Sequence, residues 1–186
     1  MIPQRSATTE GNVAGASDND LLEIILESWD RNNRILVNLL GALPPGGLEA
    51  RAMPDSPSVG EMFAHIHYVR LVFLSEDAPQ FPVEVPSQEW TSEKNADHMA
   101  EELDRSAKAV RDTLERLIRS GGEMKLHYDH PLFYLQHMIW HEGYHHGQIK
   151  LALKIAGRRL ENKKIGPLTW RIWFNKNPEG TILKAK

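Results

Sequence analysis

The chain has 186 residues, of which 41% are hydrophobic and 25% charged, and these proportions indicate one globular domain with a core of its own. The net charge of −3, with histidines neutral, argues against a general binder of nucleic acid or of anionic membranes, because such binding needs clustered excess Lys and Arg. The chain has no cysteine, so disulfides, zinc–thiolate sites and a cysteine nucleophile are excluded. A bound metal must therefore be held by nitrogen and oxygen.

The amino-terminal residues differ in character from the rest of the chain. Residues 1–17 are mostly small or polar without periodicity, so we expect a disordered tail. They contain no apolar run typical of a signal peptide, and no other run approaches membrane-spanning length, so we expect a cytoplasmic protein without a membrane partner. Apolar residues at helical spacing then predict a helix over residues 18–40, which ends at Gly41 and the Pro-Pro-Gly-Gly run that follows.

Two further helices are predicted on either side of a long loop. Ser58 and Glu61 match a capping box after Pro57 and predict a helix that continues to about residue 74. Three prolines predict a loop over residues 75–90, which is long enough for a crossover connection. Apolar and small residues in alternating steps of four and three predict a helix over residues 92–120, suited to near-parallel helix packing.

The fourth predicted helix begins near Pro131, where a proline in the first turn loses no hydrogen bond, and runs to about residue 156. We expect its inward face to carry Tyr134, His137, Met138, His141, His145, Gln148, Ala152 and Ile155. Residues 158–186 form an irregular extension that we expect to pack on the bundle or across a dimer interface. Four long helices and no convincing strand predict an all-α fold, a four-helix bundle over residues 18–157.

The fourth helix carries an unusual cluster of histidines. His137, His141 and His145 are four residues apart, so each step turns about 40° and the three form one ridge. Burial of several unpartnered imidazoles is costly, whereas histidines at i and i+4 can both bind one divalent metal. We therefore predict His141 and His145 as metal ligands and His137 as a second-shell or cavity residue. His146 points about 100° away from His145 and is not expected to be a ligand.

A third ligand is expected from a neighbouring helix, since catalytic sites commonly use three protein ligands. His65 and His67 on the second helix are about 200° apart around its axis, so only one can face the site, and periodicity does not separate them. Taken alone, His65 would more often be a hydrogen-bonded core residue than a ligand. The remaining histidines are assigned to loops or the surface: His98, His127 and His130.

The segment from His141 to His145 also matches H-E-x-x-H, in which the histidines bind zinc and the glutamate activates water for peptide hydrolysis. Glu142 is therefore a candidate general base. Against a protease, no predicted strand precedes the helix to hold a peptide, and Gly143 inside the motif costs a helix about 1 kcal/mol. An H-E-x-x-H metalloprotease remains an alternative.

Two segments together resemble the DinB/YfiT-like superfamily over roughly residues 18–157. They are Ser58-Val59-Gly60-Glu61-Met62-Phe63-Ala64-His65-Ile66 and His141-Glu142-Gly143-Tyr144-His145-His146-Gly147-Gln148-Ile149. The most specific part is the pattern histidine, three residues, histidine, one residue, Gly-Gln. The resemblance implies a four-helix bundle that binds one divalent metal, often zinc or nickel, through His65, His141 and His145. It also implies a homodimer, and it does not imply DNA binding.

Characterised activities in this and related families are largely thiol-dependent transfers and isomerisations with bacillithiol or mycothiol, while many members are named only as metal-dependent hydrolases. We therefore expect a metal-dependent enzyme, a hydrolase or a thiol S-transferase, that activates a low-molecular-weight thiol or water against a small molecule. Tyr144 and Gln148 would line the cavity or orient a ligand. A non-catalytic metal-binding or sensor bundle is the other alternative, which a closed coordination sphere would favour.

Overall fold

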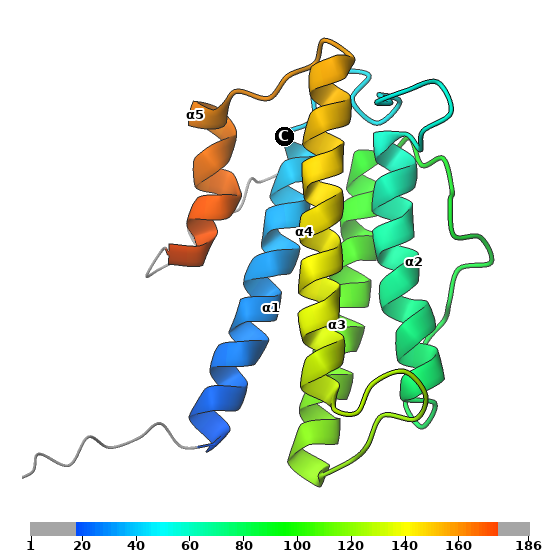
Figure 1. Cartoon of the computed structure of the whole chain (residues 1–186), viewed down its shortest axis with the longest axis vertical. Helices are drawn as coiled ribbons and strands as arrows, with labels where there is room; N and C mark the ends of the chain where they lie inside the picture. The colour runs from blue at the N-terminus through cyan, green and yellow to red at the C-terminus, as the bar shows by residue number, and fades with distance from the viewer. Residues whose placement is uncertain (1–17, 175–186) are drawn as a thin grey trace, which may run out of the picture.

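The computed structural model describes residues 18–174, and within them the fold is all-α (Figure 1). The elements are α1 (Asp18–Gly41), α2 (Val59–Asp77), α3 (Ala96–Ser120), α4 (Pro131–Ile155), α5 (Asn162–Ile165) and the 3₁₀ helices η1 (Gly166–Leu168) and η2 (Trp170–Phe174). The predicted bundle of four long helices is confirmed. The expected tail over residues 1–17, and residues 175–186 of the expected extension, lie outside the described residues.

Local signals in the sequence fix the helix ends. The Ser58 hydroxyl accepts a hydrogen bond from the Glu61 N–H, and the Glu61 carboxylate accepts one from the Ser58 N–H, so the predicted capping box is present. Nδ1 of His130 caps α4 by accepting from the Leu132 N–H at 3.1 Å. Gly121 ends α3 with φ of 64°, a left-handed conformation that glycine adopts readily.

The long loop between α2 and α3 gives the bundle its topology. In the view of Figure 1, α1 and α4 run upward and α2 and α3 run downward, and the loop over residues 78–95 returns along the outside of α2. α1 packs against α3 and α4, and α2 packs against α3 and α4, so α1 and α2 lie diagonally across the bundle. This order makes α2 and α4 antiparallel neighbours, which brings the histidines of both helices to one groove.

The core consists of two apolar clusters separated by a polar layer. One cluster contains Leu36, Ile66 and Ile149, and the other contains Trp29 and Tyr134. The side chains of the polar layer come from all four helices and are largely or fully buried: Asn32, Asn33, Arg70, Ser106 and Glu142. None of the helices in residues 18–174 is both long and apolar enough to cross a bilayer.

The buried face of α4 is rotated away from the histidine ridge. Tyr134, Met138 and Ala152 are buried as expected, but Ile155 is more than half exposed, so that part of the prediction is wrong. Glu142 and Ile149 are buried instead. Glu142 is about 100° from His141 around the axis of α4, and the residues on the Glu142 side face the core. The histidine ridge therefore lies at the edge of this buried face, next to α2.

Candidate metal centre

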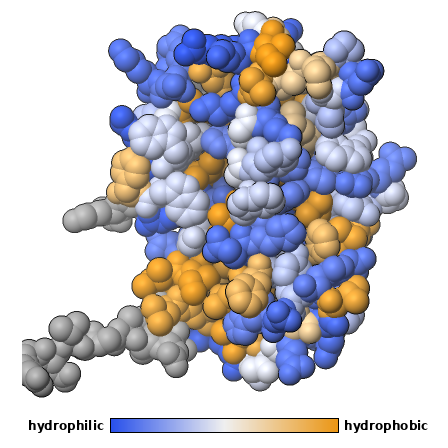
Figure 2. Space-filling model, viewed as in Figure 1, coloured by the Kyte–Doolittle hydropathy of each residue, from blue (hydrophilic) through white to orange (hydrophobic). Residues whose placement is uncertain are grey.

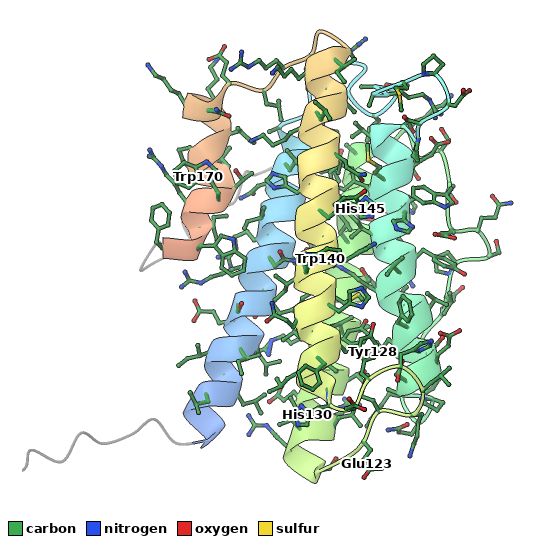
Figure 3. The ribbon with its side chains drawn as sticks, in the orientation of Figure 1. Glu123, Tyr128, His130, Trp140, His145 and Trp170 are labelled. Atoms are coloured by element: carbon green, nitrogen blue, oxygen red, sulfur yellow. The ribbon has the colours of Figure 1, made fainter. Side chains whose placement is uncertain are left out.

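Three imidazole rings converge where α2 and α4 meet. Nε2 of His141 lies 3.1 Å from Nε2 of His65 and 3.1 Å from Nε2 of His145. The ligand atoms of the three residues all lie within 4.8 Å of one another. Tetrahedral ligands about 2.1 Å from a metal are about 3.4 Å apart, so the three donors fit one ion. His145 lies on the side of α4 that faces α2 (Figure 3).

The two histidines of α2 face different neighbouring helices in the structure. His65 faces α4, whereas His67 faces α3, with its Nδ1 2.9 Å from the carbonyl oxygen of Glu102 and its Nε2 3.1 Å from a carboxylate oxygen of the same residue. His67 therefore ties α2 to α3 and is not part of the histidine group. Periodicity left this choice open because both side chains are buried.

The loop between α2 and α3 supplies two residues that sequence reasoning missed. The Glu89 carboxylate lies 2.8 Å from Nδ1 of His65, and the Trp90 ring stacks on the His65 ring with centroids 4.1 Å apart and planes 4° apart. A carboxylate on the far nitrogen of a ligand histidine fixes the ring's orientation and makes it a stronger donor. No local pattern links these loop residues to His65, because the contact depends on how the crossover loop packs on α2.

The histidines of the group are neutral at pH 7. Burial, together with the neighbouring histidines, lowers the pKa of His141 to about 3. Burial and the nearby His65 lower the pKa of His145 to about 4. Burial also lowers the pKa of His65, although Glu89 opposes the shift. Neutral rings keep a lone pair for a cation, so a metal need not displace protons from these rings.

The other predicted cavity residues surround the group. Nδ1 of His137 lies 2.8 Å from the Tyr128 hydroxyl, and its ring centroid is 6.3 Å from that of His141, so His137 is next to the site and outside the group of three. Tyr144 meets His145 edge to face with centroids 5.2 Å apart. Gln148 interacts with the His145 side chain and opposes the lowering of its pKa.

Glu142 lies in the bundle core, away from the three Nε2 atoms. Its carboxylate accepts hydrogen bonds from Nε and Nη2 of Arg70 at 2.6 and 2.9 Å, and from Nδ2 of Asn32. Both Arg70 and Glu142 are almost completely buried. A general base must reach a water at the metal, so this placement does not support the catalytic role predicted for Glu142. The signal that was missed is Arg70, a charged residue in a helix that is otherwise apolar on nearly all sides.

The remaining histidines lie outside the centre. His98 contacts Glu93 at the surface, His130 caps α4, and Nδ1 of His127 lies 2.7 Å from the Asp77 carboxylate. His146 faces α1 and lines a cavity of about 200 Å³, and its burial lowers its pKa to about 4. As expected, none of these four belongs to the histidine group.

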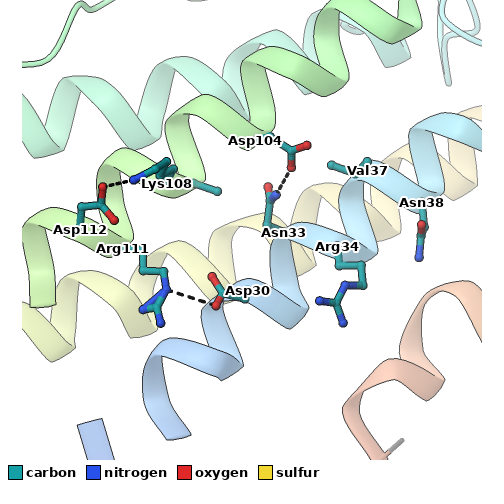
Figure 4. Close-up of a pocket in the computed structure, with 10 residues that line it drawn as sticks. Asp30, Asn33, Arg34, Val37, Asn38, Asp104, Lys108, Arg111 and Asp112 are labelled. Carbon is teal, nitrogen blue, oxygen red and sulfur yellow. Dashed lines mark hydrogen bonds and ion pairs between the residues drawn. The ribbon is translucent and has the colours of Figure 1, made fainter. Parts of the chain in front are cut away.

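A larger groove of about 440 Å³ lies between α1 and α3, on the opposite side of the bundle (Figure 4). Several of its charged and polar side chains pair with one another. Nδ2 of Asn33 donates to Asp104 at 2.6 Å, Arg111 lies 3.3 Å from Asp30, and Lys108 pairs with Asp112. The groove holds no histidine, and its acidic and basic residues are equal in number, so it does not compete with the histidine group as the candidate metal site.

The all-α bundle and the three histidines that converge between α2 and α4 place the chain in a class of helical proteins with a candidate site for one divalent metal. A family model described as the DinB family matches residues 17–165, and the chain belongs to this family. The match covers most of the chain and includes all three histidines, in agreement with the resemblance read from the two motifs. No curated protein and no solved structure matches the chain.

Proposed function

We propose that the chain is a metal-dependent enzyme in which His65, His141 and His145 hold one divalent ion that activates a low-molecular-weight thiol or water against a small molecule. The observation that carries the proposal is the convergence of the three Nε2 atoms. A bound ion would supply Lewis acidity, which lowers the pKa of a coordinated thiol or water. Zinc and nickel suit a site of neutral imidazoles without thiolates.

The residues around the histidine group would orient the metal ligands and contact the substrates. Glu89 and Trp90 hold the His65 ring from its far nitrogen and from its face, which leaves Nε2 directed at the other two histidines. The absence of cysteine is consistent with a thiol nucleophile that arrives as a cosubstrate. Tyr144 and His137 lie beside the group and would contact that cosubstrate or its electrophile.

Two features favour an enzyme with an accessible metal over a closed structural site. Among residues 18–174 no fourth His, Asp or Glu joins the three histidines, so a tetrahedral ion would keep one position for water or substrate. The nearest further histidine, His137, has its Nδ1 engaged by Tyr128. A sensor or structural module would more commonly fill all four positions with protein ligands.

The same residues give less support to the alternative function, an H-E-x-x-H protease. The mechanism requires the glutamate to take a proton from metal-bound water, but both carboxylate oxygens of Glu142 are engaged in the core by Arg70 and Asn32. We therefore do not assign the general-base role to Glu142.

The activity test uses the zinc- and nickel-loaded protein with several small thiols, and monobromobimane as the electrophile. The thiolate sulfur displaces bromide from carbon and the thiol proton passes to solvent. We expect thiol-dependent thioether formation that is lost in His145→Gln and kept in His67→Gln, a buried histidine outside the group. Peptide hydrolysis that His145→Gln and Glu142→Gln both abolish would overturn the proposal in favour of a protease. Metal binding without any turnover across the screen would overturn the enzymatic part and favour a sensor.

A further inference from the structure

A second cavity lies on the side of α4 that faces α1, whereas the histidine group lies on the side that faces α2. The cavity has a volume of about 200 Å³ and lies between α1, α4 and η2. Apolar side chains make up most of its wall, among them Ile35, Ile139, Trp170 and Trp173. In Figure 1 the segment from α5 to η2 is the orange coil beside α1, and Figure 3 labels Trp170 on it. Figure 2 shows mostly pale side chains, of intermediate hydropathy, along this side of the molecule.

Contacts between η2 and α1 hold the tryptophan wall of the cavity in place. Nη1 of Arg31 donates hydrogen bonds to the carbonyl oxygens of Ile172 and Trp173, at 2.8 and 3.1 Å. The Ile172 side chain is fully buried, and the neighbouring Trp170 and Trp173 are each less than half exposed. η2 therefore presents two tryptophans to the cavity from a fixed position.

Gly143 borders the same cavity from the interior of α4. Glycine inside a helix lowers helix stability relative to alanine, and no turn or positive φ requires a glycine at this position. A Cβ atom built on Gly143 would meet no heavy atom within 4 Å. The glycine therefore keeps open space where another residue would place a side chain.

One polar group at the cavity needs a partner. Nε2 of His146 is buried and has no hydrogen-bond partner among residues 18–174. A buried polar atom without a partner is costly, and the large majority of such atoms in folded proteins are paired. Because His146 lines the cavity, a molecule bound there can supply the missing hydrogen bond.

We propose that this cavity binds a small neutral phenol, a single aromatic ring that carries one hydroxyl group. A cavity of about 150 Å³ is already large enough to hold benzene, so a volume of about 200 Å³ suits one substituted ring. Trp170 and Trp173 offer the aromatic surface on which such a ring packs favourably. A hydroxyl both donates and accepts hydrogen bonds, so it can pair with Nε2 of His146 in either tautomer.

The charges at the cavity favour a neutral ligand over an anion. The Glu142 carboxylate lines the cavity, whereas its partner Arg70 is fully buried in the core and does not line it. An anion bound here would lie beside a like charge in a partly buried place, which is destabilising. Both carboxylate oxygens of Glu142 already accept hydrogen bonds from Arg70 and Asn32, so His146 is the polar group with capacity for a ligand.

This inference does not depend on the proposed function, because it uses neither a metal nor its ligands. The test is a fluorine NMR titration of the full-length protein with 4-fluorophenol and with 4-fluorotoluene, in which a methyl group of similar size replaces the hydroxyl. We expect 4-fluorophenol to bind at one site with a Kd below about 1 mM, and 4-fluorotoluene to bind about tenfold more weakly because it lacks the hydrogen bond. 4-Fluorobenzoate should bind more weakly than the phenol, and one equivalent of zinc should not change the affinity for the phenol.

Two variants separate the hydrogen bond from the aromatic wall. His146→Leu keeps an apolar side chain at the cavity, so the preference for 4-fluorophenol over 4-fluorotoluene should disappear while both still bind. Trp173→Ala removes part of the wall and should weaken both ligands about tenfold. Trp140→Ala, a matched change at an exposed tryptophan outside the cavity, should leave both affinities unchanged.

The proposal would be overturned if 4-fluorophenol showed no saturable binding to the wild-type protein up to about 10 mM. It would also be overturned if the preference for the phenol survived in His146→Leu, because the hydroxyl would then pair with another group. Binding that depends on zinc would place the phenol at the metal centre instead. Equal losses in Trp173→Ala and Trp140→Ala would likewise place it outside the cavity, and either result contradicts the proposal.

Discussion

The guanidinium of Arg70 and the carboxylate of Glu142 meet in the centre of the bundle through two hydrogen bonds of 2.6 and 2.9 Å. Arg70 Nη1 also donates to the Leu103 carbonyl and to Asn33, and the guanidinium lies 4.8 Å from the centre of the Trp29 ring. This pair joins α2 to α4 about one turn from the candidate metal centre. Glu142, the glutamate of the H-E-x-x-H pattern, therefore holds the two histidine-bearing helices together.

Removal of one partner of this pair should be strongly destabilising. Glu142→Leu leaves a buried, uncompensated guanidinium, which typically reduces the free energy of unfolding by about 3 to 5 kcal/mol. The double variant Arg70→Met/Glu142→Leu should lose much less than the sum of the two single changes, because no unpaired charge remains. Urea denaturation of all four proteins measures this coupling. Additive losses would show that the two side chains act independently.

Glu89 should strengthen metal binding without contacting the ion. Its carboxylate fixes the far nitrogen of His65 at 2.8 Å, so Glu89→Gln should reduce zinc affinity by about 10 to 100-fold while the stoichiometry stays at one. Glu84→Gln is the matched control, because Glu84 is an exposed glutamate on the same loop. Competition titrations with a chromophoric chelator compare the two. Equal affinities in the two variants would rule out a role for the loop carboxylate.

Asp77 should make stability depend on pH in the acid range. Burial would raise the pKa of this carboxyl, but hydrogen bonds from the N–H groups of His127 and Leu126 and from the His127 ring outweigh burial and lower it. A carboxyl with a lowered folded pKa stabilises the fold above its unfolded pKa of about 3.9, and this stabilisation is lost as the pH falls through the folded value.

Asp77→Asn should therefore destabilise the metal-free protein at pH 7 by about 1 to 3 kcal/mol, and the difference from wild type should shrink as the pH falls below about 4. Urea unfolding at a series of pH values measures the difference. His98→Ala, a change to an exposed histidine paired with Glu93, serves as a control and should shift stability little. A difference for Asp77→Asn that is constant with pH would mean that the carboxylate charge does not contribute.

Features encoded by neighbouring residues could be predicted from the sequence. The Ser58–Glu61 capping box, Pro131 in the first turn of α4 and Gly121 after α3 fixed helix ends to within a few residues. The spacing of His141 and His145 likewise placed both on one side of α4. These signals are local because helix geometry relates residues three and four apart to the same face.

Features that depend on packing between helices could not be predicted in this way. His65 and His67 are both buried, and only the position of α2 between α3 and α4 decides which of them faces the site. Glu142 matches a catalytic motif in the local sequence, and its actual partner, Arg70, lies 72 residues away, where no local pattern reveals it. Glu89 and Trp90 reach His65 through an irregular loop whose path has no periodic signal.

X-ray absorption at the zinc edge of the protein loaded with one equivalent of zinc tests the central claim most directly. The claim predicts three imidazole nitrogens at about 2.0 to 2.1 Å and one further light ligand. The imidazole count should fall in His65→Gln and stay at three in His67→Gln, the neighbouring buried histidine on the same helix. A spectrum with fewer than three imidazoles in the wild-type protein, or one that His65→Gln leaves unchanged, would contradict a site shared by α2 and α4.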